Sequence, residues 1–148
     1  MNAKELEERF ALGIYPRREI TIVRGEGALL WDDAGNEYID CTAGVGVANV
    51  GHAHPAVAKA IAAQAAQLVT SPGIFYNDTR GRLMQKLVSL APSGLNRVFL
   101  CNSGSESLEA AIKLARLTTG RTGLVSAMRG FHGRTLGALS ATFKYRDA

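Results

Sequence analysis

The sequence predicts an α/β fold, and three observations support that class. Residues 97–127 are predicted to form a strand, a helix and a second strand, the order of a βαβ unit, which favours a parallel sheet covered by helices. Short β-type runs and longer amphipathic segments alternate through the rest of the chain. The composition of the 148 residues, 47% hydrophobic and 20% charged, is that of a globular domain with a core.

Residues 1–70 are predicted to form an N-terminal segment with a helix, a small antiparallel meander, a glycine-rich loop and a second helix. The first helix covers residues 3–12, with Leu6 and Phe10 on one side. The meander follows as three β-type runs, and turn-forming residues separate the last two. These runs are residues 20–23, 28–31 and 37–41.

The glycine-rich loop covers residues 43–51, which include three glycines and no charged residue. This composition indicates a backbone that crosses a crowded place. A helix is then predicted from Pro55, a favoured first residue of helices, to about Val69.

Residues 71–148 are predicted to form a second part of the chain, of the α/β class. Its first helix covers residues 79–90, with leucines at helical spacing, and Pro92 and Gly94 follow it. The predicted βαβ unit comes next. Its strands are residues 97–101 and 123–127, and its helix is residues 103–118.

The turn between the first of these strands and its helix is a candidate phosphate site. Ser103, Gly104 and Ser105 lie where the helix begins, and the first backbone N–H groups of a helix attract anions. Gly104 allows close approach of a ligand, and the two hydroxyls can add hydrogen bonds. A capping box, with Ser103 as the N-cap residue and Glu106 three residues later, explains the same pattern without a ligand. The P-loop and dinucleotide-binding glycine patterns are both absent from this turn.

A second candidate segment is Gly130 to Thr135, which follows the second β-type run and so belongs at the same edge of a parallel sheet. Phe131 could stack on a flat cofactor, and Arg134 could bind a substrate carboxylate through two parallel hydrogen bonds. The alternatives are a phenylalanine of the core and an arginine of the surface.

Several other classes of function find little support in the sequence. His52 and His54 lack the further ligands that a zinc site needs, and basic residues are scattered rather than gathered for nucleic acid. No apolar run reaches the length of a membrane-spanning helix, and the N-terminus does not resemble a signal peptide. Cys41 and Cys101 are predicted to be buried thiols of a cytoplasmic protein.

The motifs together resemble the class III aminotransferases that depend on pyridoxal phosphate, and within them the acetylornithine type and its relatives that act on acetylated or carrier-bound lysine. The resemblance covers nearly the whole chain, from about Tyr15 to Ala148, with five motifs in family order. These are Gly25 to Ala28 followed by Leu30 to Asp32; Tyr38 to Asp40; Gly51 to Pro55; Asn102 to Glu106 leading to Glu109 to Arg116; and Phe131 to Gly137.

The resemblance implies the fold of type I pyridoxal-phosphate enzymes, with a segment of the small N-terminal domain before the start of the large parallel-sheet domain. Gly104 and Ser105, beside Ser103, match the turn that holds the cofactor phosphate. Phe131 matches the ring that stacks on the cofactor, and Arg134 matches an arginine that binds a substrate carboxylate. The family's Schiff-base lysine lies beyond Ala148, so these 148 residues contain no catalytic residue of that kind, and the chain alone is expected to be inactive.

The activity implied is transfer of an amino group from glutamate, by way of pyridoxal phosphate, to an N-acylated amino-acid semialdehyde in arginine or lysine biosynthesis. The resemblance also implies small-molecule substrates and a homodimer, with no membrane or nucleic-acid partner. Two alternatives remain. One is another class III enzyme, such as an aminomutase or a decarboxylase, and the other is a non-catalytic module that binds a phosphate ligand.

Overall fold

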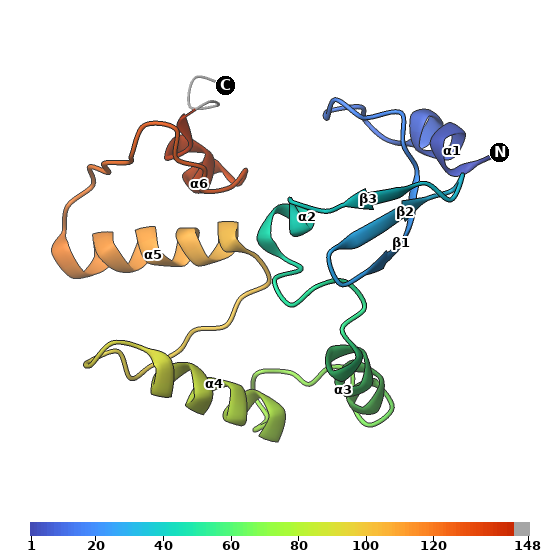
Figure 1. Cartoon of the computed structure of the whole chain (residues 1–148). Coiled ribbons are helices and arrows are strands. Elements are labelled where there is room, and N and C mark those ends of the chain that lie inside the picture. The colour runs from blue at the N-terminus through green and yellow to red at the C-terminus, as the bar shows by residue number, and fades with distance from the viewer. Residues whose placement is uncertain (144–148) are drawn as a thin grey trace. The chain divides into compact units, whose positions relative to one another are not determined.

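The computed structural model describes residues 1–143, which form parts of two compact units, Met1–Phe75 and Tyr76–Ala148 (Figure 1). The first unit contains helix α1 (Ala3–Phe10), the strands and the two helices that follow them, and the regular elements in the described part of the second unit are helices.

Helix α1 confirms the first predicted helix, although it ends two residues earlier than expected. Asn2 caps it, since its side chain accepts a hydrogen bond from Glu5 N at 2.9 Å and the Glu5 carboxylate accepts one from Asn2 N at 2.9 Å. Ala11 already has extended dihedral angles, so the helical pattern stops at Phe10. Lys4 pairs with Glu19, and Arg17 pairs with Glu7 at 3.1 Å, which ties α1 to the chain that follows it.

The meander is confirmed as a three-stranded antiparallel sheet with the order β1 (Ile22–Glu26), β2 (Leu29–Asp32) and β3 (Glu37–Ile39). Asp32 organises the turn between β2 and β3. Its carboxylate, nearly buried, accepts hydrogen bonds from Ala34 N, from the backbone and side chain of Asn36, and from the Tyr38 hydroxyl. The side-chain amide of Asn36 is the largest cause of the lowered pKa of Asp32.

Two of the glycine motifs meet at the turn between β1 and β2. Gly27 and His52 exchange backbone hydrogen bonds of 3.0 and 2.8 Å, and the His52 ring lies so close to Gly25 that a Cβ there would come within 2.7 Å of His52 Cγ. His52 Nε2 in turn lies 2.6 Å from Asp40 Oδ2. The Gly25 and Gly51–His52 motifs therefore have a packing role, with the His52 ring against Gly25 and the backbone of Gly51 against Gly27.

The glycine-rich loop is only partly the crowded crossing that was predicted. Gly51 does lie against Gly27, because a Cβ at Gly51 would come within 3.0 Å of the Gly27 Cα. Gly44 and Gly46 have no such neighbours. Both belong to the short helix α2 (Ala43–Gly46), where they adopt positive φ angles of 62° and 82°. The backbone conformation, rather than a lack of space, favours glycine there.

Helix α3 (Pro55–Ala65) begins where the sequence predicted but ends about four residues earlier. The following residues form a turn in which Leu68 N donates to the Gln64 carbonyl and the Gln64 side-chain amide donates to the Leu68 carbonyl. Gln64 thus satisfies backbone groups that a longer helix would have paired.

The second unit contains α4 (Asp78–Leu90), α5 (Gly104–Thr119) and α6 (Leu136–Ser140). The first two confirm predicted helices, and Asn77 caps α4 through Arg80 N. The strands expected at 97–101 and 123–127 are a wrong prediction, because neither segment pairs with any described strand. A β-strand requires a neighbouring strand to accept its backbone hydrogen bonds, and β-type residues alone do not provide one.

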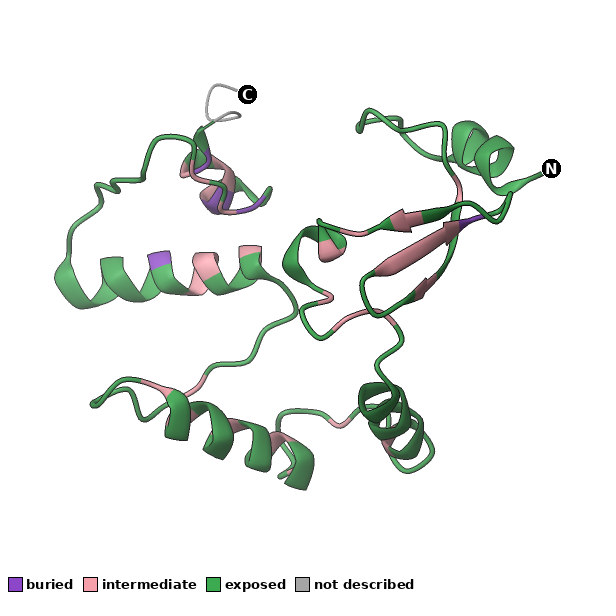
Figure 2. Ribbon diagram, viewed as in Figure 1, coloured by how far each residue is buried: buried purple, intermediate pink, exposed green. Residues whose placement is uncertain are grey.

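Few side chains are shielded from solvent in the described residues (Figure 2). The buried hydrophobic residues are Ile112 and Ala138, which belong to α5 and α6. Cys41 and Cys101, predicted to be buried, are free and exposed. Cys101 lies in a segment that no strand covers, which accounts for its exposure. Within residues 1–143 no helix is long and apolar enough to cross a membrane.

Gly25→Ala should destabilise the first unit by about 1–3 kcal/mol, because the new methyl group would overlap the His52 side chain. Urea unfolding followed by the fluorescence of Trp31, the single tryptophan, reports on this unit. Gly73→Ala is the matched control, since nothing lies within 4 Å of a Cβ at that position. Equal unfolding midpoints for the two variants would contradict the packing role of Gly25.

The Asp40–His52 contact predicts a specific dependence of stability on pH. The hydrogen bond from His52, assisted by Thr42 and Ala43, holds the pKa of Asp40 far below its usual value. A carboxylate whose pKa is depressed on folding stabilises the fold above its unfolded pKa, about 3.9 for aspartate, and this stabilisation is lost as the pH falls through the lower folded pKa.

Asp40→Asn should therefore lower the stability of the first unit at neutral pH and reduce the part of the stability that is lost below about pH 4. Trp31 fluorescence in urea, measured over a series of pH values, gives both quantities. Asp33→Asn, at an exposed carboxylate of the same unit, is the control. Stability curves for wild type and Asp40→Asn that run parallel with pH would show that the contact contributes no such linkage.

Candidate functional site

The start of α5 is defined by Ser103, which takes the N-cap position with extended dihedral angles. Its hydroxyl oxygen accepts a hydrogen bond from Glu106 N at 3.2 Å. The Glu106 carboxylate reaches one residue beyond the cap and accepts from Asn102 N at 2.5 Å. The Ser103 half of the predicted capping box is thus present, while the glutamate half is shifted by one residue.

This cap leaves two amides of the first turn available. Ser107 N donates to the Ser103 carbonyl and Glu106 N to the Ser103 hydroxyl. Within residues 1–143, the amides of Gly104 and Ser105 donate no hydrogen bond. They lie at the positive end of a 16-residue helix, where backbone N–H groups and the helix dipole both favour an anion.

A pocket of about 440 Å³ opens at this turn. It combines the start of α5 with the segment that precedes α6. The residues that line it are Ser103, Gly104, Ser105, Ser107, Leu108, Ala111, Phe131, His132 and Gly133. The predicted site residues Ser103, Gly104, Ser105 and Phe131 therefore lie around one pocket, and the Phe131 side chain is 65% exposed.

Each serine hydroxyl of the turn accepts a hydrogen bond from a backbone N–H group. The Ser105 oxygen accepts a hydrogen bond from Arg134 N at 3.3 Å, just as the Ser103 oxygen accepts one from Glu106 N. Because a hydroxyl has one proton to donate, each serine retains that proton for a further acceptor. Two amides and two hydroxyls can thus donate to one anion.

The segment that carries Phe131 is fixed on both sides of that residue. Phe143 N donates to the Gly130 carbonyl at 3.0 Å, and His132 N donates to the Thr142 hydroxyl at 3.0 Å. Thr142 is almost fully buried, and its hydroxyl lies 3.2 Å from the carbonyl oxygen of Gly133. The backbone around Phe131 is therefore held in place although its ring is largely exposed.

Gly133 presses directly against the turn. A Cβ at this position would overlap the Ser105 hydroxyl and come within 2.9 Å of the Ser105 Cβ, and φ is 128°, in the range that favours glycine. Arg134, the remaining predicted site residue, is exposed and lies outside the set that lines the pocket. Its backbone N–H donates a hydrogen bond to the Ser105 hydroxyl of the turn.

Glu109 is the main residue of this region that the sequence interpretation did not single out. Its Oε1 accepts hydrogen bonds from the Thr135 hydroxyl at 2.6 Å, Gly137 N at 2.8 Å and Ala138 N at 3.2 Å. The Thr135 hydroxyl is the largest cause of the lowered pKa of Glu109, ahead of the two amides and nearby Lys113. The available signal was its spacing four residues after Ser105, which places both on one face of α5.

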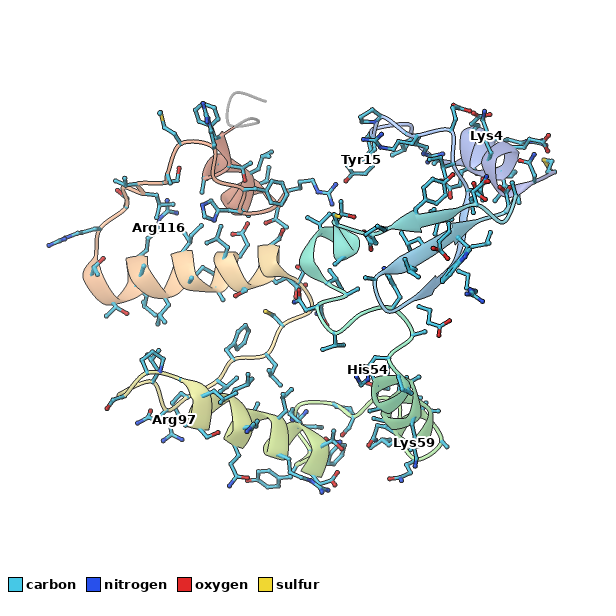
Figure 3. All side chains as sticks on the ribbon, in the orientation of Figure 1. Lys4, Tyr15, His54, Lys59, Arg97 and Arg116 are labelled. Atoms are coloured by element: carbon cyan, nitrogen blue, oxygen red, sulfur yellow. The ribbon has the colours of Figure 1, made fainter. Side chains whose placement is uncertain are left out.

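The C-terminal end of α5 is also held by hydrogen bonds. Arg116 extends from the helix toward the chain that follows it and donates two hydrogen bonds to the Thr122 carbonyl, of 3.3 and 3.0 Å (Figure 3). Gly120, with φ of 69°, ends the helix. In the described part of the chain, no group of three or more residues is arranged to hold a metal ion.

The chain is similar in sequence to curated aminotransferases. The chain is 50% identical over 143 residues to a LysW-aminoadipate semialdehyde transaminase of Deinococcus radiodurans, an alignment that covers 95% of this chain and 33% of the relative. It is 49% identical over 144 residues to an acetylornithine aminotransferase of Methanopyrus kandleri, with 97% and 37% covered. The chain thus spans about a third of the length of the curated relatives it matches.

A solved structure extends the similarity to the fold. The taurine:2-oxoglutarate aminotransferase of Bifidobacterium kashiwanohense, in complex with pyridoxal phosphate and glutamate, is 30% identical, with a TM-score of 0.89 over 99% of this chain and 34% of that one. This match gives the α/β fold of the pyridoxal-phosphate-dependent aminotransferases, in agreement with the class that the motifs implied. The family Aminotransferase class-III matches residues 14–147, and the chain belongs to this family.

Proposed function

We propose that this chain is the part of a pyridoxal-phosphate-dependent aminotransferase that binds the cofactor phosphate and covers the cofactor ring. The observation that carries the proposal is the pocket at the start of α5, which is lined by the residues that supply two available amides and two serine hydroxyls and by the exposed Phe131. Membership of the class III family supports the identity of the ligand.

The residues present fit such a cofactor. The amides of Gly104 and Ser105 and the hydroxyls of Ser103 and Ser105 would hold its phosphate. Phe131 would stack on the pyridine ring and exclude water from that face. When bound, pyridoxal phosphate supplies an electron sink for reactions at the carbon that bears the amino group.

Arg134 is proposed to bind a substrate carboxylate. Its backbone N–H donates a hydrogen bond to the Ser105 hydroxyl. The guanidinium therefore extends from a backbone that is held next to the proposed phosphate turn, residues 103–105. A planar guanidinium binds a carboxylate through two parallel hydrogen bonds, which would orient an amino acid such as glutamate.

The amino group is proposed to pass from glutamate to an N-acylated amino-acid semialdehyde. The two relatives described above support this choice, since both are named for amino transfer involving an amino acid or semialdehyde of this kind. The lysine that would anchor the cofactor is proposed to come from sequence outside these 148 residues, as is the remainder of the catalytic machinery. We also propose that the complete protein is a cytoplasmic homodimer.

The test is turnover by the complete natural protein that contains this chain. With glutamate and N-acetylglutamate semialdehyde, it should form 2-oxoglutarate only when pyridoxal phosphate is supplied. Release of carbon dioxide or migration of the amino group within one substrate would instead indicate a decarboxylase or an aminomutase. Tight, reversible cofactor binding with no turnover of any amino acid would indicate a binding module.

Phe131→Ala should weaken pyridoxal phosphate binding by about three- to tenfold, because an aromatic stacking contact contributes about 0.5–1.5 kcal/mol. A titration followed by the absorbance of the cofactor measures this affinity. Phe10→Ala, at a ring that is 71% exposed in the other unit, is the matched control. Equal affinities in the two variants would remove Phe131 from the cofactor site.

A further inference from the structure

Side-chain hydrogen bonds hold α5 and the segment 130–138 together, and the role inferred for them rests on the proposed function. α5 and α6 pack against each other within the second unit (Figure 1). The site needs this contact, because the phosphate turn belongs to α5 while Phe131 and Arg134 belong to the other segment. Hydrogen bonds within 130–143, such as those of Thr142, shape the second segment but do not attach it to α5.

The attachment is made by two side chains on one face of α5. Ser105 accepts a hydrogen bond from Arg134 N, and Glu109, four residues later and so one turn along the same face, accepts from Thr135 and from the first turn of α6. Four hydrogen bonds donated by residues 134–138 end on these two side chains.

Glu109 carries most of this attachment. One carboxylate oxygen, Oε1, accepts three hydrogen bonds. Two of them come from the amides of Gly137 and Ala138, which have no partner within their own helix. Its negative charge also lies at the positive end of α6. Gly137 permits the approach, because a Cβ there would come within 2.9 Å of Glu109 Cδ.

We infer that Glu109 is a positioning residue, which fixes Phe131 and Arg134 relative to the phosphate turn and thereby sets the alignment of cofactor ring and substrate carboxylate. Glu109 lies outside the residues that line the pocket, so it acts through the segment that it holds rather than by touching a ligand. A displacement of about 1 Å in a group that orients a substrate can reduce a rate by up to about a hundredfold.

The experiment compares Glu109→Ala and Glu109→Gln in the complete natural protein. The alanine variant should raise the KM for glutamate by about tenfold, with a smaller change in kcat, and should reduce the visible circular dichroism of bound pyridoxal phosphate. Glutamine retains an oxygen at the Oε1 position and should restore at least half of both changes. Glu37→Ala, on an exposed strand of the other unit, is the control.

Hydrogen exchange gives a reading that needs no cofactor. Peptides covering residues 130–142 should exchange faster in Glu109→Ala than in wild type, and Thr135→Val, which removes only the 2.6 Å hydrogen bond, should give a smaller increase in the same direction. Thr135→Val serves as the decisive variant for the KM and circular dichroism readings if Glu109→Ala does not fold.

The outcomes separate the two proposals. A lower melting temperature in Glu109→Ala, with unchanged KM and cofactor circular dichroism, would show a merely structural role and overturn the inference alone. A wild-type protein that binds no pyridoxal phosphate would overturn the proposed function and, with it, any role of Glu109 in alignment.

Discussion

The second unit depends on how the first turn of α5 distributes its backbone N–H groups. A helix leaves four such groups without an internal partner. Here the Ser103 hydroxyl accepts the N–H of Glu106, while the amides of Gly104 and Ser105 remain for the proposed anion. The two serines and Phe131 line one pocket at this turn. One helix terminus therefore provides a structural start and the surface proposed to bind the cofactor phosphate.

The first unit applies a comparable constraint through close backbone approach. Glycine at positions 25 and 51 leaves room for His52 to pair with the backbone of Gly27, just after β1, and to present its ring to Asp40. The family motifs in this region are thus spacing requirements with a visible cause. They keep the meander and the chain entering α3 in one arrangement, while the residues proposed to bind a ligand belong to the other unit.

Features with local causes were predictable from the sequence. The helical periodicity of 79–90 and 103–118, the turn residues between β2 and β3, and the cap at Ser103 all depend on neighbours within a few positions. The start of α5 could therefore be located from the sequence and proposed as a phosphate-binding turn. Features that depend on distant partners were not predictable. The segments 97–101 and 123–127 have β-type residues but no strand beside them, and Cys101 is exposed for the same reason. Glu109 contacts Thr135, which lies 26 positions away, and the residues next to Glu109 in the sequence do not predict this contact.

The contact between Gly133 and Ser105 has a consequence for how this site can vary among related proteins. A side chain at 133 and the hydroxyl at 105 would occupy the same space, although 28 positions separate them in the sequence. Shortening Ser105 to alanine would not make room at position 133, because the Ser105 Cβ would still lie 2.9 Å from an added Cβ and a φ of 128° favours glycine alone. We expect position 133 to remain glycine in related proteins whichever small residue occupies position 105. The start of α5 thereby limits sequence drift in a loop that follows it 28 positions later.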